Sequence, residues 1–482
     1  MCIRDRQITD HQNTKIVATV GPACNSPEQL LELVKAGVDV FRLNFSHGTH
    51  EDHRKVIEHV TKINETHGLH IGLLADLQGP KLRVGTVQEG GIPLNKGDVI
   101  RFTNKECEGT KECVYMSYPQ FASDVEVGER VLCDDGKLVF EVAYTDSKAN
   151  VDLKVLYGGI LHSNKGVNLP DTSISQPCLT EKDLIDLKYI LTQPVNWIAL
   201  SFVRRADDVH ELISHIEAAG HDAKVISKIE KPEAIENIKA IVKASNAIMI
   251  ARGDLGVEVP IERVPAIQKR IIKMCIQRAR PVIVATQMME SMMKNPSPSR
   301  AEVTDVANAV LDGTDAVMLS GETSVGDHPV EVVKAMNRII TEAEKNYELT
   351  DKRPKANPKA STFLSDTICL RAAKLAEEIG ACAITGLTVS GYTAFKISSY
   401  RPKSKISIFS NNHSMLKSLN LLWGVRTYYY DKFTTTDGTI EDKISILKKK
   451  KILKEGDIIV NTGSMPIKKR FRTNMMKITV VE

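Results

Sequence analysis

The stretch KVISKIE (224–230), KPEAIENIKAIVKAS (231–245) and AIMIARGD (247–254) decides the fold, because two short apolar segments flank a longer segment with helical spacing. The same alternation recurs from residue 14 onward and predicts strands at 15–21, 38–46, 70–78, 197–203, 224–230, 247–254, 281–287 and 316–322. Amphipathic stretches lie between them, for example at 26–37, 180–194, 206–220 and 299–313, many opened by Ser, Thr, Asp or Pro. Eight such units predict an α/β fold based on a closed (β/α)8 TIM barrel, with an open doubly wound sheet as the alternative.

Two other regions depart from this rhythm. From about 85 to 165 the chain lacks helical periodicity, and the Asp135-Gly136 pair predicts a hairpin turn. The Lys- and Pro-rich stretch 351–360 has the composition of a linker, and apolar runs alternate with helical segments again after it. We therefore expect a barrel in two parts (1–84 and 169–350), an inserted β-barrel-like lid domain (85–168) and a C-terminal α/β domain (351–482).

The bulk composition favours an intracellular protein whose partners are small molecules. A formal net charge of +4 is too balanced to indicate nucleic acid or an anionic membrane as the main partner. The nine cysteines are scattered and form no CxxC pair, so neither a disulfide framework nor a zinc site is expected. No apolar run approaches the roughly 20 residues that span a bilayer. A cytoplasmic location fits best.

Polar side chains gather at the ends of the predicted strands. In FRLNFS (41–46), Arg42, Asn44 and Ser46 alternate with apolar residues and share one face, and Lys228 and Glu230 likewise share a face. The same spacing relates Arg252 to Asp254, Val284 to Thr286 and Ser320 to Glu322. Barrel active sites collect at the C-terminal strand ends, so these side chains are expected to point into one mouth. The alternative for any single pair is a salt bridge at the barrel rim.

This set of residue types suits phosphoryl transfer. Glu230 and Asp254 offer hard oxygen ligands, and two carboxylates that leave positions for water and substrate suit Mg²⁺ (or Mn²⁺) rather than zinc. Lys228 and Arg42 carry the positive charge that neutralises a phosphoryl group in transfer. The glycines of ARGDLGVE (251–258) allow backbone N–H groups to approach an anion. Neither GxxxxGK[ST] nor GxGxxG occurs, so a nucleotide must bind in another way.

The chain resembles pyruvate kinases of the bacterial type from residue 14 to the C-terminus. The resemblance rests on TKIVATVGPA (14–23), FRLNFSHG (41–48), GPKLRVG (79–85), KGVNLP (165–170), LSFVRRADDV (200–209), SKIEKPEAIENI (227–238), ARGDLGVE (251–258), ATQMMESM (285–292) and LSGETSVGDHP (319–329), in the order and spacing of that family. It implies transfer of the phosphoryl group of phosphoenolpyruvate to ADP, giving pyruvate and ATP at the end of glycolysis. It also implies a barrel interrupted by a lid, and a homotetramer.

Site roles follow from the resemblance alone. It implies that Glu230 and Asp254 bind Mg²⁺ and that Lys228 stabilises the phosphoryl group. The implied phosphoenolpyruvate contacts are Arg42, Gly253, Asp254, Thr286 and Lys81, with Thr286 near the face of the enolate that is protonated. The implied nucleotide contacts are Arg83, Lys165 and His47.

One motif departs from the potassium-dependent members, which read DTKGPEIRT where this chain has DLQGPKLRV (76–84). Leu77 stands where a Thr donates an oxygen to K⁺, and Lys81 replaces the usual Glu. The ammonium of Lys81 can supply the charge that K⁺ brings, so we expect activity without K⁺ although Asn44, Ser46 and Asp76 of the ion site remain. The alternative is a solvated loop lysine.

In the C-terminal domain, TVSGYTA (388–394) resembles a phosphate-binding effector loop, in which Thr388, Ser390, Gly391 and Thr393 could ring a phosphate. A sugar phosphate or nucleotide is the candidate effector. The basic stretch 464–475 departs from the Gly-rich loop of sugar-bisphosphate-activated members, so a solvated surface is favoured slightly over a sugar-phosphate contact. Two other functions stay open at this point: a metal-dependent aldolase acting on phosphoenolpyruvate or pyruvate, and a noncatalytic metabolite-binding relative.

Overall fold

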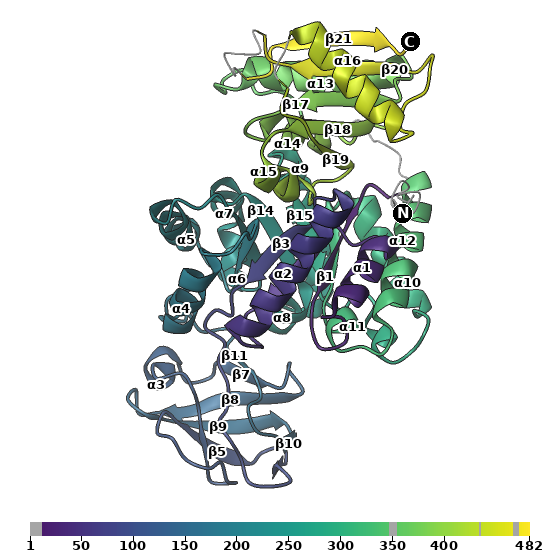
Figure 1. Cartoon of the computed structure of the whole chain (residues 1–482). Coiled ribbons are helices and arrows are strands. Elements are labelled where there is room, and N and C mark those ends of the chain that lie inside the picture. Colours follow the sequence, from purple (N-terminus) through teal and green to yellow (C-terminus); the bar gives the residue numbers. More distant parts are fainter. Residues whose placement is uncertain (1–11, 347–353, 433–434, 466–471) are drawn as a thin grey trace.

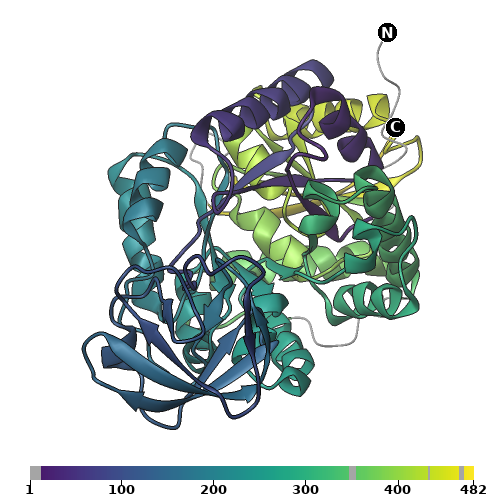
Figure 2. The same ribbon diagram turned by 90° about the horizontal axis from the view of Figure 1, so that it is seen from below.

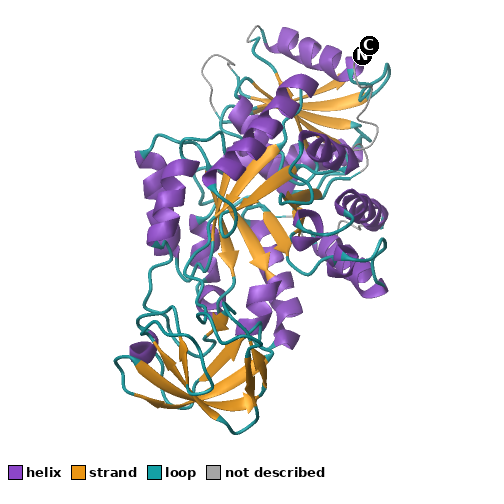
Figure 3. Cartoon of the chain, turned by 60° about the horizontal axis from the view of Figure 1, so that its bottom comes forward, coloured by secondary structure: helices purple, strands orange, loops and turns teal. Residues whose placement is uncertain are grey.

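The computed structural model describes residues 12–346, 354–432, 435–465 and 472–482, and it shows three bodies in a row. A barrel lies in the middle, a β-rich domain (the B domain) at one end and an α/β domain (the C domain) at the other (Figures 1 and 2). Their strands form separate sheets (Figure 3). No helix in the described part of the chain is long and apolar enough to cross a membrane.

The barrel is closed by eight parallel strands in the order β1-β16-β15-β14-β13-β12-β3-β2, so the barrel prediction is confirmed and the open sheet is wrong. The strands are β1 (Lys15–Thr19), β2 (Val40–Asn44), β3 (Gly72–Asp76), β12 (Trp197–Leu200), β13 (Lys224–Ile229), β14 (Ala247–Ala251), β15 (Val282–Ala285) and β16 (Ala316–Leu319). Each lies within a predicted range but ends two or three residues earlier, or one residue earlier for β13. The residues that follow these strand ends therefore need not keep the strand alternation.

Most helices around the barrel bury apolar side chains against the strands. They are α1 (Pro27–Ala36), α2 (His50–His67), α4 (Glu181–Ile190), α5 (Ala206–Ala218), α6 (Pro232–Glu236), α7 (Ile238–Ala244), α8 (Arg252–Glu258), α9 (Val264–Gln277), α10 (Arg300–Asp312), α11 (Gly321–Ser324) and α12 (Pro329–Lys345), with short 3₁₀ turns at Ile261–Arg263 and Glu290–Met293. Helix α10 begins at a capping box in which Ser299 and Glu302 exchange hydrogen bonds, and it ends at Gly313.

The B domain follows β3, as the loss of helical periodicity predicted. It contains β4 (Ile92–Leu94), β5 (Val99–Thr103), β6 (Cys113–Tyr115), α3 (Phe121–Asp124), β7 (Arg130–Cys133), β8 (Leu138–Thr145), β9 (Asn150–Tyr157), β10 (Gly159–Leu161) and β11 (Val167–Asn168). The predicted turn connects β7 to β8: Asp134 O accepts from Lys137 N at 3.2 Å, and Asp135 and Gly136 have φ of 56° and 84°. The domain has its own apolar core.

The C domain closes the opposite end of the barrel. It contains α13 (Phe363–Glu378), β17 (Ala383–Leu387), α14 (Tyr392–Ser399), β18 (Lys405–Ser410), α15 (His413–Leu419), β19 (Val425–Tyr429), α16 (Thr436–Lys449), β20 (Ile458–Gly463) and β21 (Met475–Val480). Leu421 packs with the residues that fill the barrel interior, and the indole N–H of Trp197, at the start of β12, donates to Ser418 O at 3.2 Å. The N-terminal barrel end is thereby sealed, so the C-terminal end is the open one.

Candidate active site

Arg42, Asp76 and Lys228 meet inside the mouth of the barrel. Each lies two residues beyond an apolar side chain of the barrel interior (Val40, Leu74 and Ile226), so strand alternation turns all three inward. Arg42 Nε donates to Asp76 Oδ2 at 2.7 Å, and Lys228 Nζ lies 3.4 Å from Asp76 Oδ1. The expected inward orientation of Arg42 on β2 and Lys228 on β13 is confirmed.

Glu230 completes this charged group from the end of β13. Its Oε1 lies 2.9 Å from Lys228 Nζ, and its Oε2 accepts from Phe202 N at 2.7 Å. Lys228 also donates to Ser201 Oγ at 2.7 Å. Phe202 has a φ of 55°, which is a strained conformation for an aromatic residue and turns its N–H toward the carboxylate.

Burial and mutual charge set the protonation of this group. Burial disfavours the ammonium of Lys228, but the charges of Asp76 and Glu230 outweigh it and raise the pKa of Lys228. Burial likewise opposes the charge on Asp76, but Lys228 and Arg42 hold the pKa of Asp76 below its ordinary value. Burial raises the pKa of Glu230; Lys228 opposes this and the nearby charge of Asp254 adds to it. Asp254 therefore lies close enough to interact electrostatically with Glu230.

Asp254 reaches the mouth by a route that strand alternation did not predict. Strand β14 ends at Ala251, and Arg252 begins the short helix α8. Arg252 leaves the site and forms two 2.7 Å hydrogen bonds with Asp305. The expectation that Arg252 and Asp254 share a strand face is wrong, because the backbone coils before Asp254. The Asp254 carboxylate remains partly exposed, with Lys81 Nζ 4.0 Å from its Oδ1.

Thr286 and Gly253 adjoin each other at the same rim. Gly253 N donates to Thr286 Oγ1 at 2.6 Å, and a Cβ at Gly253 would lie only 3.3 Å from that oxygen. Thr286 has a φ of 68°, which is rare for a β-branched residue and follows the end of β15 at Ala285. The pairing of Thr286 with Val284 across one face is therefore wrong, since Val284 packs in the layer between strands and helices.

Ser320 and Glu322 do not share a strand face either, because α11 begins directly after Ser320. The buried Glu322 carboxylate accepts from Met289 N at 3.2 Å and from Ser320 N at 2.6 Å. It ties the ends of β15 and β16 together. These contacts are hydrogen bonds from backbone N–H groups, so they differ from the salt bridge that was the alternative for this pair.

The residues of the expected monovalent-ion site are partly present. Asn44 Oδ1 accepts from Ser46 N at 3.2 Å, and Asp76 is buried beside them. Asp76 Oδ1 has no hydrogen-bond partner among the described residues although the Lys228 ammonium lies 3.4 Å away. The Leu77 side chain is buried in the apolar layer around the barrel and brings no oxygen.

The expected nucleotide contacts fall into two places. Arg83 and Lys165 lie in adjacent segments at the base of the B domain, where Val84 N donates to Lys165 O at 2.9 Å. Arg83 Nη1 donates to Asn164 O, and Lys165 Nζ pairs with Asp134 Oδ1 at 2.9 Å. His47 is exposed beyond the end of β2.

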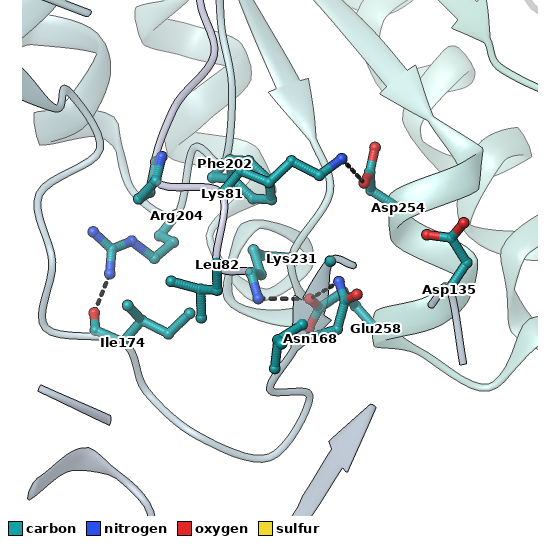
Figure 4. Close-up of a pocket in the computed structure, with 13 residues that line it drawn as sticks. Lys81, Leu82, Asp135, Asn168, Ile174, Phe202, Arg204, Lys231, Asp254 and Glu258 are labelled. Atoms are coloured by element: carbon teal, nitrogen blue, oxygen red, sulfur yellow. Dashed lines mark hydrogen bonds and ion pairs between the residues drawn. The ribbon is translucent and has the colours of Figure 1, made fainter. Parts of the chain in front are cut away.

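A pocket joins the barrel mouth to the B domain (Figure 4). It is lined by Pro80, Lys81, Leu82, Asp135, Gly166, Val167, Asn168, Ile174, Phe202, Arg204, Lys231, Asp254 and Glu258. The buried Glu258 accepts from Lys231 Nζ at 2.6 Å and from Asn168 Nδ2 at 2.8 Å, which links β11 of the B domain to the barrel.

Sequence reasoning did not single out this link, or Ser201 and Phe202. Ser201 carried one signal, since it is a polar residue directly after the apolar strand WIAL (197–200). No sequence signal linked Lys231 to Glu258, because 26 residues lie between them and neither residue belongs to an alternating strand pattern.

In the C domain, the loop 388–391 and the start of α14 line a second pocket. Thr388 Oγ1 accepts from Gly391 N at 2.9 Å, and Thr393 Oγ1 is hydrogen-bonded to Thr473 Oγ1 at 2.5 Å. Ser390 is exposed. Of the basic stretch, residues 466–471 lie outside the described residues, whereas Arg472 lines the pocket.

Comparison with known proteins gives one consistent result. The family model described as "Pyruvate kinase, barrel domain" matches residues 11–333, and "Pyruvate kinase, alpha/beta domain" matches 366–479. The pyruvate kinase of Geobacillus stearothermophilus is 41% identical over 474 residues, which are 98% of this chain and 80% of the relative. That of Mycobacterium intracellulare is 43% identical over 94% of this chain and 95% of the relative. A pyruvate kinase structure from Cryptosporidium parvum superimposes with a TM-score of 0.92 at 33% identity, covering 99% of this chain and 98% of that one.

Proposed function

The chain belongs to the pyruvate kinase family, and from this membership we propose how its own residues carry out the reaction. It transfers the phosphoryl group of phosphoenolpyruvate to ADP and gives pyruvate and ATP, the last step of glycolysis. The observation that supports the assignment of roles is the buried Lys228 ammonium, held between Asp76 and Glu230 at the open barrel end.

Lys228 and Arg42 act as the fixed positive charges of the site. Lys228 stays protonated because two carboxylates raise its pKa, and Ser201 fixes the direction of its Nζ. Arg42 is oriented by Asp76 and by a 3.0 Å hydrogen bond to Thr19 Oγ1. Both side chains are largely buried, so these charges stabilise the phosphoryl oxygens more strongly than solvated groups could.

The donor set fits a Mg²⁺ (or Mn²⁺) ion held by Glu230 and Asp254. Among the described residues no group of three or more His, Cys, Asp or Glu could hold a metal by itself. Two carboxylates suit Mg²⁺, which keeps water and substrate oxygens in its other positions. Asp254 supports this role because its carboxylate is partly exposed and its nearest cation, Lys81, lies at 4.0 Å. When bound, the ion supplies Lewis-acid stabilisation of the substrate oxygens.

Thr286, Gly253, Asp254 and Lys81 form the rest of the phosphoenolpyruvate site in this proposal. The Thr286 hydroxyl is fixed between Gly253 N and Ala285 O, at 2.6 Å from each. A hydroxyl held in this way can hold a proton or an ordered water near the enolate carbon. The strained φ of Thr286 is the kind of backbone feature that functional sites retain.

Activity without K⁺ is supported by the two departures in the third-strand motif. Leu77 offers no ligand, and the Lys81 ammonium stands at the rim beside Asp254. Asn44, Ser46 and Asp76 are the remnant of the ion site. The measurement is turnover in tetramethylammonium buffer with and without KCl. Strong activation by KCl contradicts the proposal.

Arg83, Lys165 and His47 are proposed to contact ADP. Lys165 is carried by the B domain, so closure of that domain over the barrel brings its charge to the nucleotide and excludes water. The contact between Asn168 and Glu258 supports a lid attached at β11. We further propose the domain boundaries 1–84, 85–168, 169–350 and 351–482, of which the last falls in a segment outside the described residues.

A cytoplasmic homotetramer that responds to a sugar-phosphate or nucleotide effector completes the proposal. All eight cysteines among the described residues are free thiols, as in a reducing compartment. The edge strand β21 exposes Met476, Ile478 and Val480, a row of apolar side chains suited to contact between subunits. Thr388, Ser390, Gly391 and Thr393 form the proposed phosphate loop.

A coupled assay of pyruvate formation tests the function. Pyruvate is expected to form from phosphoenolpyruvate only when ADP and Mg²⁺ are both added. Pyruvate formation that persists without ADP contradicts the proposal and favours a different phosphoenolpyruvate enzyme. No turnover under any condition favours a noncatalytic relative.

A further inference from the structure

A network of three polar side chains joins the B domain to the barrel. Asn168 of β11 and Lys231 both donate to one carboxylate oxygen of Glu258, Oε1, at 2.8 Å and 2.6 Å. Glu258 is only 3% exposed and Lys231 only 5%, and Figure 4 shows the three side chains converging from different segments of the chain. The proposed chemistry of phosphoryl transfer leaves this network without a function.

The two barrel members of the network lie close in sequence to the proposed metal ligands. Lys231 directly follows Glu230, just beyond the end of β13. Glu258 is the last residue of the seven-residue helix α8, whose first turn carries Asp254. The ion pair between Lys231 and Glu258 therefore connects the two segments that supply the metal carboxylates. A buried ion pair holds its partners together, because breaking it leaves an uncompensated charge.

On the B-domain side, Asn168 belongs to a short segment that also carries Lys165. Val84 N donates to Lys165 O, and Val167 N donates to Leu82 O, each at 2.9 Å. Strand β11 also pairs with β7 in antiparallel orientation. This segment is thereby held on both sides, so the positions of Asn168 and Lys165 change together when the B domain moves.

Asn168 provides the polar contact between the B domain and α8. Among the described residues its bond to Glu258 is the one hydrogen bond between them. The turn between β7 and β8 also approaches α8, but only in van der Waals contact, since a Cβ at Gly136 would lie 3.9 Å from the Val257 side chain. Glu258 Oε2 is buried and has no hydrogen-bond partner in the described part of the chain. Without Asn168, the carboxylate would therefore keep Lys231 alone among these partners.

We propose that Asn168 and Glu258 are positioning residues that couple the orientation of the B domain to the metal carboxylate of Asp254 through helix α8. The inference rests on the proposed function and deepens it, since it names the contact that holds Lys165 and Asp254 in a fixed relation. With the bond formed, α8 is held at its last residue. The direction of its first turn follows, because the helix is only about two turns long. The alternative is that the Asn168 side chain only fills space between the two domains.

Two substitutions of Asn168 separate these readings. A hydrogen bond to a charged group shifts an equilibrium by roughly 10- to 100-fold, so its loss frees the B domain from α8. Asn168→Ala removes the donor and leaves the ion pair of Lys231 and Glu258 intact. Asn168→Asp also removes the donor, keeps the side-chain volume and adds a like charge beside Glu258. Coupling through the bond predicts that Asn168→Asp is more impaired than Asn168→Ala, whereas a space-filling role predicts the reverse order.

Two measurements on the full chain report on the two sides of this coupling. Binding of Mn²⁺ alone, followed by electron paramagnetic resonance, reports on Glu230 and Asp254 without substrate or nucleotide. We expect Asn168→Ala to weaken Mn²⁺ binding about threefold or more and to raise KM for ADP about tenfold, with kcat at saturating ADP within about threefold, because the pair acts on binding and not on the chemical step. Asn150→Ala and Asn150→Asp are the matched controls and should change none of these values, since Asn150 Nδ2 donates to Asp146 Oδ2 at 2.8 Å within the B domain.

The wild-type protein gives a third test that needs no variant. Coupling between two sites is reciprocal, so Mn²⁺ alone should hold the B domain more firmly on α8. Hydrogen exchange at the Val167 amide, which donates to Leu82 O, should therefore slow when Mn²⁺ is added.

Three results overturn the inference: unchanged exchange at the Val167 amide with Mn²⁺ bound, unchanged Mn²⁺ binding in folded Asn168→Ala, or an Asn168→Asp protein closer to wild type than Asn168→Ala. The coupled assay of pyruvate formation distinguishes this failure from that of the proposed function. Turnover that depends on ADP and Mg²⁺ leaves the proposed function intact in each of these cases. A wild-type protein that binds no Mn²⁺ overturns the inference and the proposed metal site together.

Discussion

Replacement of Lys228 by Met removes the one buried ammonium that contacts both Asp76 and Glu230 and keeps a side chain of similar length. If the ammonium stabilises the phosphoryl group in transfer, this change must act mainly on kcat. Truncation of a group that acts only in the transition state lowers kcat and kcat/KM together. We therefore expect a large loss in kcat and a change in KM for phosphoenolpyruvate below about tenfold.

The size of the loss follows from the geometry. Two unit charges about 4 Å apart interact by about 4 kcal/mol at an effective dielectric constant of 20, and each 1.36 kcal/mol is a factor of ten in rate. The variant should thus lose about 10³-fold in kcat. Loss of one partner from a buried ion pair also destabilises the fold by about 3–5 kcal/mol, so the assay belongs well below the melting temperature.

The assay is the coupled measurement of pyruvate, with circular dichroism to establish that the variant is folded. Lys224→Met is the matched control: it lies on the same strand four residues earlier, burial lowers the pKa of Lys224, and only Asp222 opposes this. The control should keep kcat within about twofold, since its charge is far from the mouth. A folded Lys228→Met protein with kcat within tenfold of wild type refutes the reasoning.

Three further outcomes are expected. The double change Leu77→Thr with Lys81→Glu should make turnover depend on K⁺ by about tenfold or more, measured in tetramethylammonium buffer, because the fixed cation is lost and an oxygen ligand is restored. Gly253→Ala places a Cβ 3.3 Å from Thr286 Oγ1 and should lower kcat/KM for phosphoenolpyruvate about tenfold, whereas unchanged steady-state kinetics would remove this pair from the site. Lys443 is a buried residue of α16, and Lys443→Met should raise the melting temperature most at pH 7 and below and progressively less toward pH 10.5. The native amine, with its pKa lowered to about 7, gives up its proton on folding across that window, and a pH-independent difference contradicts this.

Most of the fold could be predicted from the sequence, because each helix or strand is encoded by the pattern of its own residues. The barrel strands are short and mainly apolar, and helices such as α10 carry their own caps, here Ser299 and Gly313. The inserted domain could be recognised by its loss of helical periodicity. What closed the N-terminal end of the barrel was not predicted, because Leu421 reaches the interior from more than 400 residues beyond β1.

The direction of a site side chain was predicted correctly for residues within a strand. It was predicted wrongly for Arg252 and Thr286, which lie beyond the strand end. Arg42 and Lys228 lie within strands, so period-two alternation places them correctly. Arg252 and Thr286 follow the last strand residue, where a helix start or a left-handed residue redirects the chain. Such turns depend on tertiary contacts such as the bonds from Arg252 to Asp305, which no local pattern encodes. Alternation did point to Asp254, but its carboxylate reaches the mouth from helix α8 and not from a strand face.

The most direct test of the central claim is to follow phosphorus by ³¹P NMR while the purified protein acts on phosphoenolpyruvate, ADP and Mg²⁺. The roles proposed for Lys228, Glu230 and Asp254 predict that the phosphoenolpyruvate signal is replaced by the γ-phosphate signal of ATP in equal amount, and that Lys228→Met slows this about 10³-fold. Release of inorganic phosphate without ATP, or transfer at an undiminished rate in the folded variant, would contradict it.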